Sequence, residues 1–222
     1  LVRLLVDSPG ADPAAVREAA VSVGWEPPAE LAVLVYRPGS PDRVAAHLPA
    51  GTLASTIDES AVALIPDPRA PGRRGEIERA LRGRAAALGT PAPVEAAHRS
   101  ADRARALERI RESGMLPGGG LLLAEEHLAE LVTLGEPELL EELAERRLAP
   151  LAELTPGARE RLEATLLAWL DNQGVVRDAA DALHVHAQSV RYRVVKLREL
   201  FGAELDDPTP RYELLLARQS RR

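Results

Sequence analysis

Apolar and polar positions divide the chain into a first part where strand-like and helix-like patterns alternate and a last part with helical patterns only. Short apolar runs bounded by turn residues predict strands, and apolar residues spaced three or four apart predict helices. The expected strands are Leu31 to Tyr36, Thr52 to Thr56, Ala61 to Ile65 and a further candidate at Pro93 to Ala97. The expected helices between and around them are Asp12 to Gly24, Gly75 to Leu88 and Ser100 to Ser113.

Strands that alternate with helices indicate a small α/β domain in residues 1–117. Its second and third strands form a hairpin around the polar turn at residues 57–60. Three consecutive glycines at 118–120 then interrupt the chain. The helical patterns from Glu125 to Leu134 and from Pro137 to Arg146 predict a linker or dimerisation segment over residues 118–155. We expect an α+β protein with an all-α domain at residues 156–222.

That last domain shows three helical patterns in close succession. Pro156 to Leu170 carries an apolar stripe, Val176 to Leu183 is short and rich in alanine, and Ala187 to Phe201 carries a second stripe. The turns between them are only a few residues long. A long helix, a short helix and a tight turn into a third helix form the pattern of a helix-turn-helix.

The outward face of the third helix is polar and basic. In a helix-turn-helix, this face meets base edges in the major groove while neighbouring groups bind phosphates. The candidates for base edges are Gln188, Ser189 and Tyr192, and those for phosphates are Arg191, Arg193 and Lys196. Arginine also pairs with guanine, so the division of roles stays open. The alternative is an ordinary solvated face of a core helix.

The composition excludes several kinds of functional site. The chain has no cysteine, which excludes disulfides, thiolate metal ligands and a cysteine nucleophile. Pro156 to Arg222 carries 11 basic and 10 acidic residues, whereas the rest has a net charge of -7. His184 and His186 lack a third ligand in a plausible frame, so no metal site is expected. No apolar run is long enough to span a membrane, and a cytoplasmic protein is expected.

The C-terminal segment resembles the helix-turn-helix of PucR-type transcriptional regulators, a group that includes purine-catabolism and sugar-diacid regulators. The resemblance lies in TLLAWLDNQG, RDAADALHVHAQSVRYRVVKLRELFG and LDDPTPRYELLLA, within Leu162 to Arg218. Ser189 stands where a threonine is typical and keeps the hydroxyl, and Gln188 stands where Asn or Gln is usual. The resemblance implies that the HVH segment is a turn that packs the motif.

The first domain is similar in layout to the degenerate GGDEF-like domain that often precedes this helix-turn-helix. In active diguanylate cyclases the hairpin carries two glycines before Asp-Glu, whereas here the hairpin reads Thr56-Ile57-Asp58-Glu59-Ser60. The β-branched pair occupies the room that the phosphates need. The first strand, LAVLVYRPGSPD, also lacks the acidic residue expected to hold a metal near its end. We therefore expect no catalytic residues, no cofactor and no cyclase activity.

The leading hypothesis is a transcriptional regulator that binds double-stranded DNA as a homodimer and responds to an unknown small-molecule effector. Because the sequence opens at Leu1 rather than Met, we expect a fragment. The effector-sensing region then lies either in a missing upstream domain or in the first domain of this chain. The second hypothesis is a dimerisation or small-ligand-binding protein with a vestigial helix-turn-helix. A cyclase-type enzyme is the third.

Overall fold

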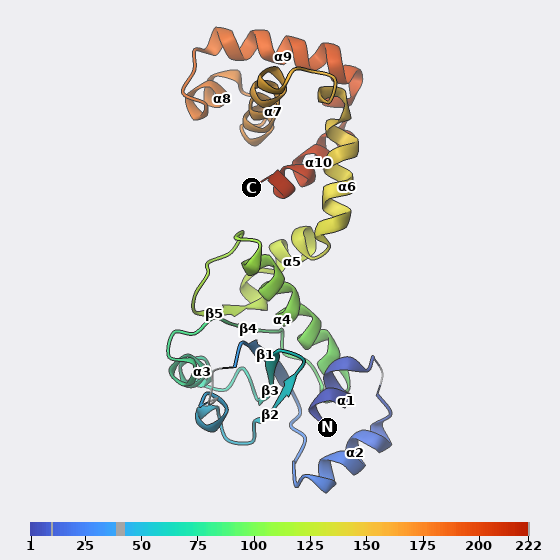
Figure 1. Ribbon diagram of the computed structural model, residues 1–222, viewed down its shortest axis with the longest axis vertical. Helices are drawn as coiled ribbons and strands as arrows, with labels where there is room; N and C mark the ends of the chain where they lie inside the picture. The colour runs from blue at the N-terminus through green and yellow to red at the C-terminus, as the bar shows by residue number, and fades with distance from the viewer. Residues whose placement is uncertain (10, 39–42, 222) are drawn as a thin grey trace. The chain divides into compact units, whose positions relative to one another are not determined.

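The computed structural model describes residues 1–9, 11–38 and 43–221, which fall into two compact units, Leu1–Gly135 and Glu136–Arg222 (Figure 1). The first unit contains a sheet with helices, and the second is entirely helical, so the expected α+β class is confirmed. The expected linker at residues 118–155 does not form a body of its own. Its first part completes the sheet of the first unit, and its second part packs in the second unit.

The sheet of the first unit has five strands in the order β2-β3-β1-β4-β5. Only β4 and β5 are parallel, and the other neighbours are antiparallel. β2 and β3 form the predicted hairpin, with Asp58 in the turn at a φ of 52°. The strands are β1 Leu31–Tyr36, β2 Leu53–Ile57, β3 Ser60–Pro66, β4 Ala86–Leu88 and β5 Leu121–Leu123.

Helices cover both faces of this sheet, which is why β1 is buried along its whole length. One face packs on α1, α2 and α4, and the other packs on α3 and on Val44 and Leu48, which flank the short helix η1 (Figure 1). α4 presents a row of alanines to β1, and small side chains allow a helix to approach a sheet closely. The helices are α1 Val2–Asp7, α2 Pro13–Ser22, η1 Ala45–His47, α3 Arg73–Leu81, η2 Val94–Ala96, α4 Ala97–Glu112, η3 Ala124–Glu126 and α5 Leu128–Leu134.

Three expectations for this unit were wrong. The helix predicted from Gly75 to Leu88 ends at Leu81, because Arg82 and Gly83 turn the chain with φ values of 51° and 80°, and strand β4 follows. The candidate strand at Pro93 to Ala97 is a single turn of 3-10 helix. Strand β5 lies where only helix was expected, in the segment after the three glycines.

The second unit consists of two layers of helices around one core. α7, α8 and α9 pack together, and α10 returns to pack against α6 (Figure 1). The Arg147 side chain on α6 pairs with Glu213 on α10 and lies 3.5 Å from Glu204. The helices are α6 Pro137–Leu148, η4 Ala149–Leu151, α7 Pro156–Asp171, α8 Val176–Ala182, α9 Ala187–Phe201, η5 Gly202–Leu205, α10 Pro208–Ala217 and η6 Arg218–Arg221.

A close backbone approach joins β1, β4 and α4 in the first unit. The Val33 N–H donates to the Ser100 hydroxyl oxygen at 2.9 Å, and the Gly89 N–H donates to the Val33 carbonyl at 2.8 Å. A Cβ at Gly89 would lie 1.9 Å from the Ser100 carbonyl oxygen. Only glycine fits here without moving α4 away from the sheet.

Gly89→Ala is therefore expected to lower the free energy of unfolding by about 1–3 kcal/mol, the usual cost of overpacking. Urea unfolding followed by circular dichroism measures the change. The matched control is Gly75→Ala in α3, where an added Cβ meets nothing within 4 Å. Alanine is the better helix former, so this control should be neutral or slightly stabilising. Equal losses in the two variants would contradict the close-approach explanation.

Candidate DNA-binding site

Small buried side chains position the three helices of the motif, α7, α8 and α9. Ala179 and Ala180 on α8 are 0% and 2% exposed, and they lie where α8 meets α7 and α9. A short turn over residues 183–186 joins α8 to α9. The bounds of α9 agree with the prediction, and its Val190, Val194 and Leu197 are buried as expected. One long face of α9 consequently remains free of this core (Figure 1).

Five of the six predicted DNA-contacting residues share this exposed side of α9. Tyr192 is the most exposed large apolar residue among them, at 75%. The five exposed residues are Gln188, Ser189, Arg191, Tyr192 and Lys196. Their side chains come from the first ten residues of α9, the part of a recognition helix that meets base edges.

Two contacts within α9 fix the polar side chains of this face. The Arg191 guanidinium donates to the Gln188 side-chain oxygen at 3.3 Å. The Lys196 ammonium lies 2.9 Å from Glu199, whose carboxylate accepts its hydrogen bond and raises the pKa of Lys196 above its ordinary value. Lys196 therefore stays charged, and phosphate would compete with Glu199 for it.

Arg193 differs from the other five because it is half-buried. Its guanidinium donates to the Thr165 hydroxyl oxygen on α7 at 3.2 Å, and that hydroxyl donates to the Arg161 carbonyl at 2.7 Å. Thr165 is fully buried. This link between α7 and α9 was not foreseen from the sequence, because it depends on the packing of two helices that are distant along the chain.

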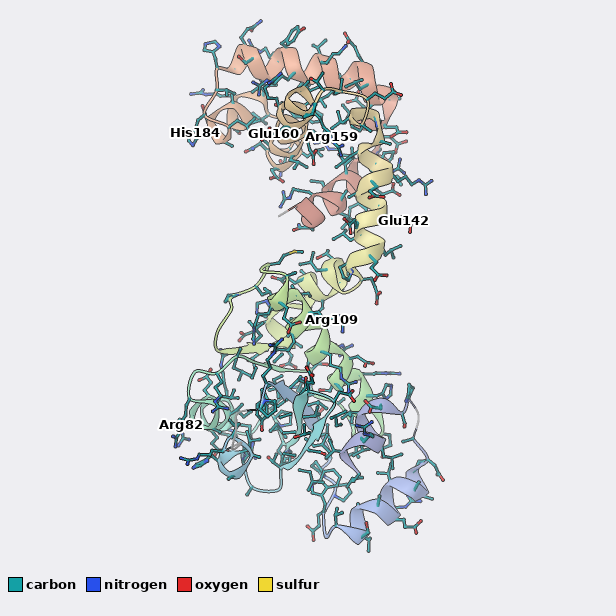
Figure 2. The ribbon with its side chains drawn as sticks, viewed as in Figure 1. Arg82, Arg109, Glu142, Arg159, Glu160 and His184 are labelled. Carbon is teal, nitrogen blue, oxygen red and sulfur yellow. The ribbon has the colours of Figure 1, made fainter. Side chains whose placement is uncertain are left out.

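The HVH segment forms the turn into α9 and supplies its N-cap. The His186 Nδ1 accepts the backbone N–H of Gln188 at 3.2 Å, so Nδ1 carries no proton in this arrangement. His184 is exposed with a φ of 53°, at the end of α8 (Figure 2). Among the residues that the structure describes, no group of three or more His, Asp or Glu is placed to hold a metal ion. Within the same residues, no helix is long and apolar enough to cross a membrane.

Trp169 on α7 is buried, as its position in the apolar stripe predicted. The Arg211 guanidinium of α10 lies 5.0 Å from the centre of its ring. A cation over the face of an indole ring is attracted by the ring quadrupole. This contact joins α10 to the helix-turn-helix, and it was not predicted because the two residues are distant along the chain.

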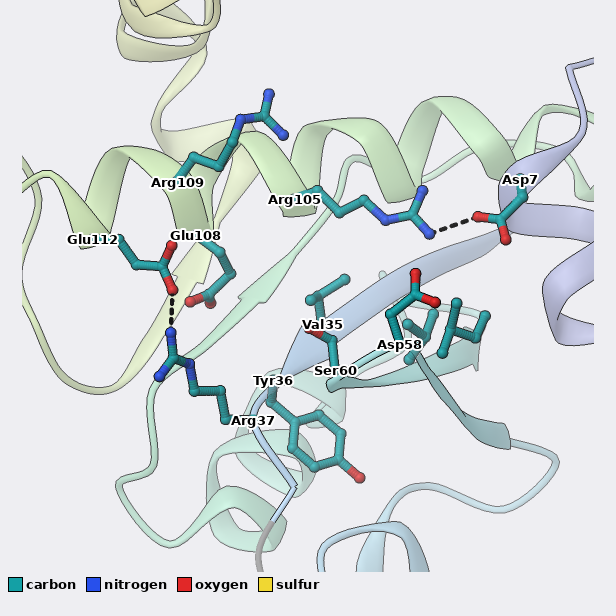
Figure 3. A pocket seen from close by; sticks show the side chains of 12 residues that line it. Asp7, Val35, Tyr36, Arg37, Asp58, Ser60, Arg105, Glu108, Arg109 and Glu112 are labelled. Carbon is teal, nitrogen blue, oxygen red and sulfur yellow. Dashed lines mark hydrogen bonds and ion pairs between the residues drawn. The ribbon is translucent and has the colours of Figure 1, made fainter.

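The first unit contains a separate cavity of about 470 Å³ between α4 and the β2–β3 hairpin (Figure 3). Ion pairs cross its walls: Arg105 with Asp7 at 2.7 Å, and Arg37 with Glu112. Glu108 points from α4 toward the strands. Burial raises the pKa of the Glu108 carboxyl above its ordinary value, and the nearby Arg111 opposes this shift. The cavity therefore combines apolar strand residues with charged groups of both signs.

The hairpin turn lies at this cavity, and Asp58 is part of the wall, while its side chain is 87% exposed. Thr56 and Ile57 are the last residues of β2, where a cyclase would carry glycine. Ile57 is buried against the core. Residues 39–42 follow the first strand, and the part of the metal expectation that falls on them lies outside the described residues.

A short helix, a tight turn and a helix with one buried and one polar face define the class of helix-turn-helix DNA-binding proteins. Residues 162–219 match the family model described as PucR C-terminal helix-turn-helix domain. Residues 162–219 therefore form a helix-turn-helix domain of the PucR type, and this domain points to a regulatory role.

Relatives of the chain extend beyond this domain. A protein of Thermomonospora curvata named "Uncharacterized protein in pkwA 5'region" is 35% identical over 60% of this chain and 71% of its own length. "Uncharacterized protein Rv2242" of Mycobacterium tuberculosis is 32% identical over 59% of this chain, which spans only 30% of that protein. The crystal structure of "Regulator of Polyketide Synthase Expression" from Bifidobacterium adolescentis covers 98% of this chain and 89% of its own. It shares 19% identity with this chain, at a TM-score of 0.44.

His186→Ala is expected to destabilise the second unit by about 1 kcal/mol, the typical cost of losing a side-chain N-cap. His186→Asn restores an acceptor at the same position and should recover most of the loss. Thermal unfolding of the two variants and the parent chain measures both effects. If asparagine were as damaging as alanine, the imidazole would act through packing rather than through the cap.

Proposed function

We propose that the chain is an effector-responsive transcription factor that binds specific double-stranded DNA sequences through α9. The observation that supports this most is the division of α9 into a buried apolar stripe and an exposed polar one. The buried stripe holds the helix in the motif, and the exposed one is free to enter the major groove.

In this proposal Gln188, Ser189 and Tyr192 contact base edges, and Arg191 and Lys196 contact phosphates. The hydrogen bond from Arg191 to Gln188 supports this assignment, because it orients the Gln188 amide that would contact a base. Arg193 keeps its proposed phosphate role through N–H donors that Thr165 does not use, since a guanidinium has five of them.

Fluorescence anisotropy tests the proposal, with duplexes selected by the whole chain from a random library and scrambled duplexes of equal length. We expect tighter binding to the selected sequence and weaker binding as salt increases. Arg191→Ala should weaken binding to both duplexes and reduce the salt slope by about one, as loss of one phosphate contact requires. Arg146→Ala, an exposed arginine on α6, is the control and should change neither. Equal binding of selected and scrambled duplexes by the parent chain would favour the alternative of a vestigial motif.

We further propose that two copies bind together, because one helix-turn-helix reads a short half-site and paired half-sites multiply specificity. A cytoplasmic location follows from the proposed contact with the genome. Sedimentation of the chain with and without a selected duplex measures the number of copies. One copy on a duplex with two half-sites would overturn the dimer.

The proposed effector site is the cavity between α4 and the hairpin. Its carboxylates suit hydrogen-bond donors such as those of a purine, and its arginines suit carboxylates such as those of a sugar diacid. Thermal unfolding with a panel of purines and sugar diacids should show one class that raises the Tm. Ser60→Phe, which fills the cavity, should abolish that rise. A rise retained in Ser60→Phe would place the ligand elsewhere.

A further inference from the structure

The exposed face of α9 also contains an apolar residue that is not one of the six candidate DNA-contacting residues. Val195 is 55% exposed in the middle of the helix. It follows Gln188 and Tyr192 at spacings of seven and three residues, so the three side chains share one face. Val195 is the ninth residue of α9. It lies close enough to the first turns of the helix to enter the same groove.

An exposed valine on this helix stands out against its surroundings. The core of the second unit takes the opposite stripe, so packing within the unit does not require a β-branched residue here. Valine is also a poorer helix former than the polar residues around it. The neighbouring Arg191, Lys196 and Arg198 are all exposed. Cations on the flanks of an apolar patch complement the phosphates on either side of a groove rather than an apolar protein surface.

The major groove of DNA offers one apolar group, the 5-methyl of thymine. We propose that Val195 contacts the methyl group of a thymine in each half-site, beside the base contacted by Tyr192. This inference rests on the proposed function. It assigns Val195 as a specificity-determining residue, and it predicts that the preferred DNA contains a thymine at a fixed position in each half-site.

Deoxyuridine tests this contact, because it differs from thymidine only by the missing methyl group. Each dT of a duplex selected by the whole chain is replaced by dU, one position at a time, and binding is measured by anisotropy. For the parent chain we expect one position per half-site at which dU weakens binding about fourfold, as burial of a single methyl group predicts.

Val195→Ala should lose this sensitivity, with less than about a twofold difference between dT and dU at that position. Alanine is the better helix former and the side chain is exposed, so the variant should fold. Val195→Thr keeps the branched shape with less apolar surface and should show an intermediate sensitivity. Val132→Ala, an exposed valine on α5 in the other unit, is the matched control and should behave as the parent chain does.

The outcomes separate the inference from the proposed function. If the parent chain prefers the selected duplex but no dU replacement weakens binding, the methyl contact is overturned and the transcription-factor proposal stands. The same holds if Val195→Ala keeps the full dU sensitivity. If the parent chain binds selected and scrambled duplexes equally, the proposed function fails, and the inference fails with it.

Discussion

The packing of α8 against its neighbours is the constraint on which the candidate DNA-binding surface depends. Two alanines with almost no exposed surface lie where α8 meets α7 and α9, and they let the helices approach closely. Larger side chains there would push the helices apart. Since the buried stripe of α9 is held by this contact, the same packing sets the direction of the opposite stripe. The packing of the motif therefore does not depend on the polar residues of that stripe.

Contacts that cross between helices then set the remaining geometry of the motif. The Arg193 link to Thr165 ties the recognition helix to α7, and the Arg211 guanidinium over Trp169 ties α10 to the same helix. The ion pairs of Arg147 connect α10 with α6. Charged side chains in this unit thus have two separate places, because some join one helix to another and others lie on the exposed face of α9.

The first unit is organised by a different constraint, the burial of β1 on both faces. Helix α4 reaches the sheet closely at Gly89 and Ser100, while toward its C-terminal end it borders the charged cavity beside the hairpin. The hairpin retains Asp58 and Glu59 but has Thr56 and Ile57 where phosphates would need space. The cavity beside this hairpin is the proposed effector site.

The sequence alone predicted α6, α7, α8 and α9 of the second unit, including both ends of α9, because helical periodicity and capping are local properties. It also predicted the hairpin, and it proposed six candidate residues on α9, of which five lie on the exposed side of the helix. Only the tertiary structure decided that Ala86–Leu88 and Leu121–Leu123 are strands, since segments of three residues become strands through their partners rather than through their own pattern. It likewise decided that Arg193 turns toward Thr165 and that Val195 is exposed, because burial depends on which helices meet.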